Sequence, residues 1–314
     1  MRKALFLVGP TASGKSSLAL LLAKKLKGEI VSCDSMQVYR GMDIGTDKPS
    51  AKEQKQVRHH LINLSSPRSE FSVFEHRQLA LKAMETIFSR GKLPIVIGGS
   101  GLYVKALVEG ISPQPGGHSG LRRRFREIAR RNGVRHLYSK LQAVDPIRAA
   151  KIHPNDQKRI IRALEILSAS GRSQADWERK TKGLVSAGIE PILFGLERDR
   201  KELYERVERR VDRMFDRGWV SEVKRLKKTG LSKTAREAIG YREILEHLKG
   251  MRDLFDAQAE IKKRTRHLVK KQLTWFRKTG GIHWIRVRGN RFAEKATRVI
   301  SKEMRRRERF EHAA

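Results

Sequence analysis

Eight residues near the start of the chain, Gly9–Ser16 with the sequence GPTASGKS, match the spacing G-x-x-x-x-G-K-[ST]. In this pattern the backbone N–H groups surround a phosphate, the lysine adds a point charge, and the last hydroxyl binds Mg²⁺. The start of the following helix adds positive potential. We therefore expect a phosphate-binding loop formed by Gly9, Pro10, Thr11, Ala12, Ser13, Gly14, Lys15 and Ser16, with Ser16 as the metal ligand and Mg²⁺ as the cofactor.

An acidic residue, Asp34, follows the short apolar run EIVSC at 29–33. Ligands bind at the carboxyl ends of the strands in open α/β sheets, so Asp34 should face the phosphate loop. A turn or helix-cap aspartate is the alternative. The run LPIVIGG at 93–99 lacks the terminal acid that holds Mg²⁺ in many ATP hydrolases. Gln37 has an amide suited to an adenine edge, with an ordinary polar turn residue as the alternative.

The alternation of apolar runs and helical patterns in the sequence predicts the strands and helices that position these residues. Apolar runs at 3–8, 29–33 and 93–99 indicate buried strands, and the residues between them include helical patterns at 16–26 and 72–90. This alternation predicts an α/β fold, with a P-loop NTPase-like parallel sheet core and helices on both faces.

The pattern changes at the Pro- and Gly-rich run 112–120 and returns with the apolar run 191–196. Residues 121–182 between them are basic and have helical patterns. The sequence after 200 predicts mostly helix, with a strand at 282–287 and a charged tail. We expect residues 1–116 and 184–314 to form the core with its C-terminal helices. We expect residues 117–183 to form a helical insertion domain.

The charge of the chain indicates a polyanionic partner. Its 314 residues include 69 Lys and Arg against 34 Asp and Glu, a formal net charge of +35. Nucleic acid is the expected partner, and a solubility adaptation is the alternative. The one cysteine excludes internal disulfides and a cysteine-built zinc site. No run approaches the about 18 apolar residues of a membrane helix, so we do not expect the protein to bind membranes. We also expect a cytoplasmic protein and a monomer.

Seven motifs occur in the order GPTASGKS, DSMQVYRGMDIGTDKPS, HHLINL, PIVIGGSGLYVKAL, DPIRAAKIHPNDQKRIIRALEI, REAIGYRE and KKQLTWFRK. Together they resemble the tRNA dimethylallyltransferase family, also called tRNA isopentenyltransferases, over residues 5–278. The single cysteine and the length are similar to the bacterial form rather than to eukaryotic members with an added zinc finger.

The resemblance implies transfer of a dimethylallyl group from dimethylallyl pyrophosphate to N6 of adenine 37, in tRNAs that read codons beginning with U. The product is N6-isopentenyladenosine. The phosphate loop would hold the donor's pyrophosphate, and Asp34 would act as the general base that takes the proton of the amino group. Ser100 occupies a position where the family commonly has threonine. Because serine also carries a hydroxyl, we expect Ser100 to be a catalytic residue.

The resemblance also implies a surface for the anticodon stem-loop of tRNA, which includes the insertion domain. Four arginines at helical spacing form a basic face, and we expect one of them to clamp the pyrophosphate, with a solvated face as the alternative: Arg206, Arg209, Arg210 and Arg213. Lys271 occupies a position where the family commonly has arginine. Lysine retains the positive charge but cannot form the bidentate hydrogen bonds of an arginine. The implied tRNA contacts are Asp34, Ser35, Met36, Gln37, Arg122, Lys158, Arg159, Ile160, Ile161, Arg162, Glu237, Ala238, Ile239, Gly240, Tyr241, Arg242, Lys270, Lys271, Gln272, Thr274, Trp275 and Arg277.

Three other functions fit parts of the sequence. A nucleotide or small-molecule kinase would use the loop for ATP. A prenyltransferase acting on free AMP would share the core motifs, but the basic insertion and the net charge favour tRNA. A non-catalytic RNA-binding protein could retain a relict loop, but the intact Lys15, Ser16 and Asp34 argue against it.

Overall fold

A computed structural model describes residues 1–115, 117–173, 176–177, 181–289 and 291–312 of the chain. The chain forms two compact units, Met1–Val108 with Leu184–Ala314, and Glu109–Gly183. The unit boundaries lie at 108/109 and 183/184, against 116/117 and 183/184 in the division based on sequence. Residues 174–175 and 178–180 of the expected insertion lie outside the described part. Among the described helices, none has the length and apolar character needed to cross a bilayer.

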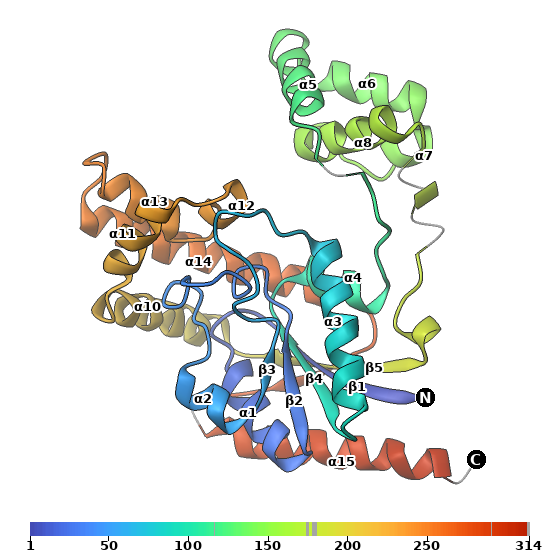
Figure 1. The fold of residues 1–314 in the computed structure, drawn as a ribbon, viewed down its shortest axis with the longest axis vertical. Coiled ribbons are helices and arrows are strands. Elements are labelled where there is room, and N and C mark those ends of the chain that lie inside the picture. Colours follow the sequence, from blue (N-terminus) through green and yellow to red (C-terminus); the bar gives the residue numbers. More distant parts are fainter. Residues whose placement is uncertain (116, 174–175, 178–180, 290, 313–314) are drawn as a thin grey trace. The chain divides into compact units, whose positions relative to one another are not determined.

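The larger unit is built on a six-stranded sheet with the order β3-β2-β4-β1-β5-β6 (Figure 1). Its pairings are parallel, and central Leu5 lies opposite Ile95 on one side and Ile192 on the other. The continuous apolar runs are buried because helices cover both faces. The predicted α/β class with a P-loop-like parallel sheet is confirmed. The strands are β1 (Arg2–Val8), β2 (Gly28–Ser32), β3 (His59–His60), β4 (Leu93–Gly98), β5 (Ile189–Glu197) and β6 (Ile282–Arg286).

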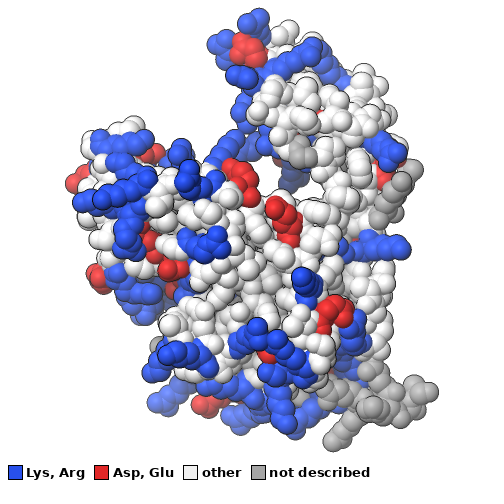
Figure 2. Space-filling model, viewed as in Figure 1, with Lys and Arg blue, Asp and Glu red and all other residues white. Residues whose placement is uncertain are grey.

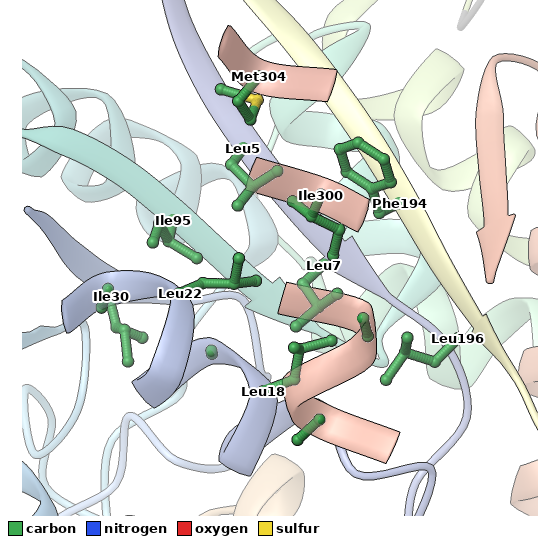
Figure 3. Packing of buried hydrophobic residues seen from close by; sticks show 14 of the residues in the cluster. Leu5, Leu7, Leu18, Leu22, Ile30, Ile95, Phe194, Leu196, Ile300 and Met304 are labelled. Atoms are coloured by element: carbon green, nitrogen blue, oxygen red, sulfur yellow. The ribbon is translucent and has the colours of Figure 1, made fainter. Parts of the chain in front are cut away.

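Helices α1 (Lys15–Lys25) and α15 (Phe292–His312) cover one face of the sheet. Figure 3 shows Leu18 and Leu22 of α1 packed with Ile300 of α15 against Leu7 of the sheet. Met304 is 2% exposed, so α15 contributes to the core as far as the segment expected to be a charged tail. The tail prediction is therefore wrong for this residue, because its apolar face continues the spacing of Ile300.

The opposite face of the sheet is covered by α3 (Val73–Phe88) and α4 (Gly101–Val108). Their buried side chains, Ala80, Met84 and Leu107 among them, pack on Phe6 and the neighbouring strands. Ser72 begins α3 with a capping box to Glu75, which satisfies the first N–H groups of the helix.

A helical layer follows β5 and holds the loop between β2 and β3. Glu222 is buried and accepts the N–H groups of Asp43, Ile44 and Gly45 at 2.7–3.2 Å. The Tyr241 hydroxyl donates to the same carboxylate at 2.7 Å. This layer consists of α10 (Arg200–Asp216), α11 (Trp219–Thr229), α12 (Lys233–Arg236), α13 (Tyr241–His247) and α14 (Leu254–Arg277), while the loop itself contains α2 (Ala51–Gln56).

The smaller unit is helical in its described part. It comprises α5 (Ser119–Asn132), α6 (Val134–Val144), α7 (Pro146–Ala149) and α8 (Gln157–Ser170). Leu137, Leu141 and Ile160 belong to its own apolar cluster. The buried Glu165 accepts hydrogen bonds from the His118 N–H and from both Arg122 and Arg162, which fixes α5 against α8. A short 3-10 helix, η1 (Val185–Ala187), then leads into β5.

Candidate active site at the phosphate loop

The phosphate loop connects the end of β1 to the start of α1 and depends on two glycines. Gly9 and Gly14 have φ values of +141° and +99°, which disfavour side chains. A Cβ on Gly14 would also lie 2.4 Å from the Phe292 ring of α15. Ser13 is fully buried, and its hydroxyl lacks a hydrogen-bond partner among the described residues. The loop is thus a tight backbone turn that retains an unused donor.

Lys15, the first residue of α1, folds back over the loop. Its Nζ donates to the carbonyl oxygens of Gly9 at 2.9 Å and Pro10 at 2.7 Å. Burial and the charge of Arg210 lower the pKa of Lys15 to about 7, against the opposite influence of Asp34 and Asp47. An anion bound in the loop would favour the charged form of the Lys15 amine and so raise its pKa. The position of Lys15 therefore suits the binding of a phosphate group.

Two arginines of the basic helix α10 reach the same loop. Arg206 Nε donates to the Ala12 carbonyl at 2.9 Å, and Arg210 donates to the Thr11 hydroxyl at 2.5 Å. Arg210 also binds Asp47 at 3.1 Å. Burial, followed by the charge of Arg198, lowers the pKa of Arg206. The other two candidates from the sequence, Arg209 and Arg213, are exposed, so Arg206 and Arg210 are the arginines that the fold brings to the loop.

Gln272 of α14 joins the phosphate loop to the turn after β4. Its Oε1 accepts the Thr11 N–H at 2.8 Å, and its Nε2 donates to the Gly99 carbonyl at 2.9 Å. A Cβ on Gly99 would lie 2.6 Å from that Nε2, and one on Gly101 would lie 2.2 Å from Trp275. The glycines of GGSG therefore allow α14 to approach. Gln272, which was expected to contact tRNA, links two loops of the site in this structure.

The same turn carries Ser100 at the start of α4. Its carbonyl accepts the N–H groups of Tyr103 at 3.0 Å and Val104 at 3.1 Å. The side chain is half-buried. Since the Ser100 turn is tied through Gln272 to the phosphate loop, the two candidate parts of the site, far apart in sequence, form one arrangement at the carboxyl edge of the sheet.

Asp34 follows β2 at that edge and is half-buried. Its Oδ1 accepts the N–H of Met36 at 2.8 Å and that of Gln37 at 3.4 Å, which is the turn-forming role considered as an alternative. Its charge also acts on Lys15 in the phosphate loop. The two roles are compatible, because the turn fixes the carboxylate and engages one of its oxygens.

The Gln37 amide is used within the protein. Ser32 Oγ donates to its Oε1 at 2.9 Å, and its Nε2 donates to the carbonyls of Thr46 and Asp47 at 3.3 Å. The amide thus holds the loop that carries Asp47 rather than presenting free groups to an adenine. Ser35 and Met36 beside it are half-buried.

Several residues expected to touch tRNA lie in the interior instead. Tyr241 is fully buried, and a Cβ on Gly240 would lie 2.0 Å from Trp219, so both are packing residues. Ala238 is 6% exposed beside them, and Ile239 is half-buried. Ile160 and Ile161 are buried in the smaller unit. The buried side chains of this group therefore pack in the apolar interior of the structure, and the tRNA contacts expected of them stay a prediction.

The remaining candidates lie nearer to solvent. Arg122 and Arg162 are half-buried and paired with Glu165, and Arg277 is paired with Glu197. Trp275 is 38% exposed over the glycine turn. The others are exposed, namely Lys158, Arg159, Glu237, Arg242, Lys270, Lys271 and Thr274.

The fold and this site define a P-loop α/β protein whose loop is lined by three cationic side chains and has Asp34 at the same sheet edge. A sequence model of the family described as IPP transferase matches residues 37–279. The chain belongs to this family, as its motifs predicted.

Proteins named tRNA dimethylallyltransferase align with most of this chain. It is 44% identical over 283 residues to a tRNA dimethylallyltransferase of Geobacter metallireducens, covering 90% of this chain and 91% of that one. It is 40% identical over 307 residues to one from Alkaliphilus oremlandii, covering 97% of each.

Solved structures agree with the sequence relatives. A tRNA isopentenylpyrophosphate transferase from Bacillus halodurans matches with a TM-score of 0.72 and 36% identity, over 99% of this chain and 100% of that one. A eukaryotic dimethylallyltransferase acting on tRNA matches with a TM-score of 0.72 and 28% identity, over 91% and 74% of the two chains. These matches remove the kinase alternative.

Proposed function

We propose that this enzyme transfers a dimethylallyl group from dimethylallyl pyrophosphate to N6 of adenine 37 in tRNAs that read codons beginning with U. The product would be N6-isopentenyladenosine. The observation that carries the proposal is the convergence of Lys15, Arg206 and Arg210 on a phosphate loop linked by Gln272 to the Ser100 turn. Membership in the IPP transferase family and the named tRNA dimethylallyltransferase relatives support the reaction class.

The phosphate loop would hold the donor's pyrophosphate. As the C–O bond to the leaving group breaks, its developing charge would be met by the loop N–H groups, the buried Ser13 hydroxyl and Lys15. Arg206 and Arg210 would add charge from the α10 side. Ser16 is an exposed residue in the first turn of α1, where its hydroxyl would serve as a ligand of a hydrated Mg²⁺. The ion would supply charge neutralisation for the pyrophosphate.

Asp34 would act on the acceptor. Its Oδ1 is engaged by the turn, so Oδ2 would accept a hydrogen bond from the exocyclic amino group of a flipped-out adenine. The adenine nitrogen forms the new C–N bond while its proton passes to the carboxylate, and pyrophosphate leaves. The Ser100 hydroxyl, in the turn tied to the loop, would contact the leaving group or the base.

The tRNA itself would be held by exposed basic side chains, including Lys158, Arg159, Lys270 and Lys271. We further propose that the enzyme works as a monomer in the cytoplasm. The smaller unit presents a basic helix, α5, suited to the phosphates of an anticodon stem.

Incubation with dimethylallyl pyrophosphate, Mg²⁺ and either unmodified tRNA or AMP, followed by mass analysis of the nucleosides, tests the acceptor. Prenylated adenosine among the tRNA nucleosides with unchanged AMP is the expected result. Prenylated AMP with unmodified tRNA would instead favour the free-nucleotide alternative, and no product with either would remove the enzymatic proposal.

A further inference from the structure

The amino edge of the sheet, opposite the phosphate loop, is lined with basic side chains. Because the strands of the described sheet pair in parallel, the residues before each strand share this edge. Arg58 precedes β3, Lys27 precedes β2 and Lys92 precedes β4, and these strands are neighbours about 4.8 Å apart. We call the exposed residues Lys24, Lys25, Lys27, Lys55, Arg58, Arg90 and Lys92 the amino-edge surface.

Contacts among the elements make this surface continuous. Lys24 at the end of α1 donates to Gln56 at the end of α2 at 2.8 Å. The Ile30 N–H donates to the Arg58 carbonyl at 2.9 Å. Figure 2 shows Lys and Arg side chains gathered in the lower part of the view, where Figure 1 places α1 and α2.

Carboxylates offset little of this charge. Glu29 is buried and is shared by Lys92, Arg90 and His60. Desolvation opposes its ionisation, but the hydrogen bonds from Lys92 and His60 lower the pKa of Glu29 to about 2. Glu53 is occupied by the capping box of α2. A cluster of seven cations with two engaged carboxylates therefore leaves a strongly positive surface.

The surface is separate from the active site. Lys15 and Lys25 stand at opposite ends of α1, so about 15 Å of helix lies between the phosphate loop and the amino edge. Binding of a substrate adenine at the carboxyl edge therefore does not explain the positive charge of the amino-edge surface. A polyanion with regularly spaced phosphates matches a row of cations on neighbouring strands.

We propose that the amino-edge surface binds a second RNA segment, held through its phosphates without regard to sequence, while the active site is occupied. Its occupant is the backbone of an RNA duplex, and this binding goes beyond the proposed prenyl transfer. The surface would account for part of the net charge of +35 that a single anticodon-loop site leaves unexplained.

The test uses the full-length enzyme saturated with an anticodon stem-loop, to which a labelled RNA duplex without a loop is added. The amino-edge variant carries Lys25→Gln, Lys27→Gln, Lys55→Gln and Arg58→Gln. The control variant removes the same charge from α11 with Lys224→Gln, Arg225→Gln, Lys227→Gln and Lys228→Gln. Thermal melting checks that both are folded.

We expect the saturated wild type and control to bind the duplex and the amino-edge variant to bind it at least about tenfold more weakly, with a log–log salt slope lower by about 3 to 4. Prenyl transfer to the stem-loop should be unchanged in that variant, which separates this proposal from the function itself. Displacement of the duplex by the stem-loop, wild-type binding by the amino-edge variant, or equal losses in both variants would overturn the proposal.

Discussion

Replacing Gln272 by alanine removes the side chain that joins the phosphate loop to the Ser100 turn. Two hydrogen bonds are lost, to the Thr11 N–H and to the Gly99 carbonyl, at 2.8 and 2.9 Å. Each is worth about 1 kcal/mol. A loss of about 2 kcal/mol in positioning predicts a fall of about 30-fold in kcat/KM for the pyrophosphate donor.

Steady-state kinetics with each substrate varied in turn measures this effect. Gln272→Glu keeps the acceptor for Thr11 but loses the donor to Gly99 and adds a negative charge beside the loop, so it should weaken donor use further. Lys263→Ala, an exposed change on the same helix, is the control and should leave the kinetics unchanged. A raised KM for tRNA with unchanged donor kinetics would refute the linking role of Gln272. That result would favour direct contact of Gln272 with tRNA.

Asp34→Asn should retain tRNA binding but lower the turnover number by at least about 100-fold, since a general base is removed; near-normal single-turnover rates would contradict the role. Lys15 is charged below its pKa of about 7 and neutral above it, so donor affinity measured by calorimetry should weaken as the pH rises from 7 to 9. Lys15→Arg, which stays charged, should lose that dependence, and an identical profile would count against the lysine. Gly240→Ala places a Cβ 2.0 Å from Trp219 at a φ of +95°, so the free energy of unfolding should fall by more than about 2 kcal/mol. An unchanged melting temperature would show that this packing is not required.

The sheet could be predicted because its strands are continuous apolar runs. The expected strands 3–8, 29–33 and 93–99 correspond to β1, β2 and β4 with small differences at their ends. Strand β3 has only two residues, His59 and His60, so no periodicity could mark it. Met304 precedes a run of arginines in the sequence, so its burial could not be predicted from the local composition. The packing of α15 on α1 buries it.

The candidate site was predictable where the motif is local. The spacing of Gly9, Gly14 and Lys15 is contained in one turn, and the structure forms that turn. Selection of Arg206 and Arg210 among four similar arginines depends on which side of α10 meets the loop. The contact of Gln272 with Thr11 joins residues far apart in the chain, so no local pattern could reveal it.

The proposed function requires that the phosphate loop bind a pyrophosphate donor for transfer to tRNA. Quantifying pyrophosphate released and isopentenyladenosine formed in one reaction with unmodified tRNA tests it directly, in wild type and in Lys15→Ala. We expect equal amounts of both products in the wild type and a large loss of donor kcat/KM in Lys15→Ala. Consumption of ATP without prenylated tRNA, or unchanged donor kinetics in the variant, would contradict it.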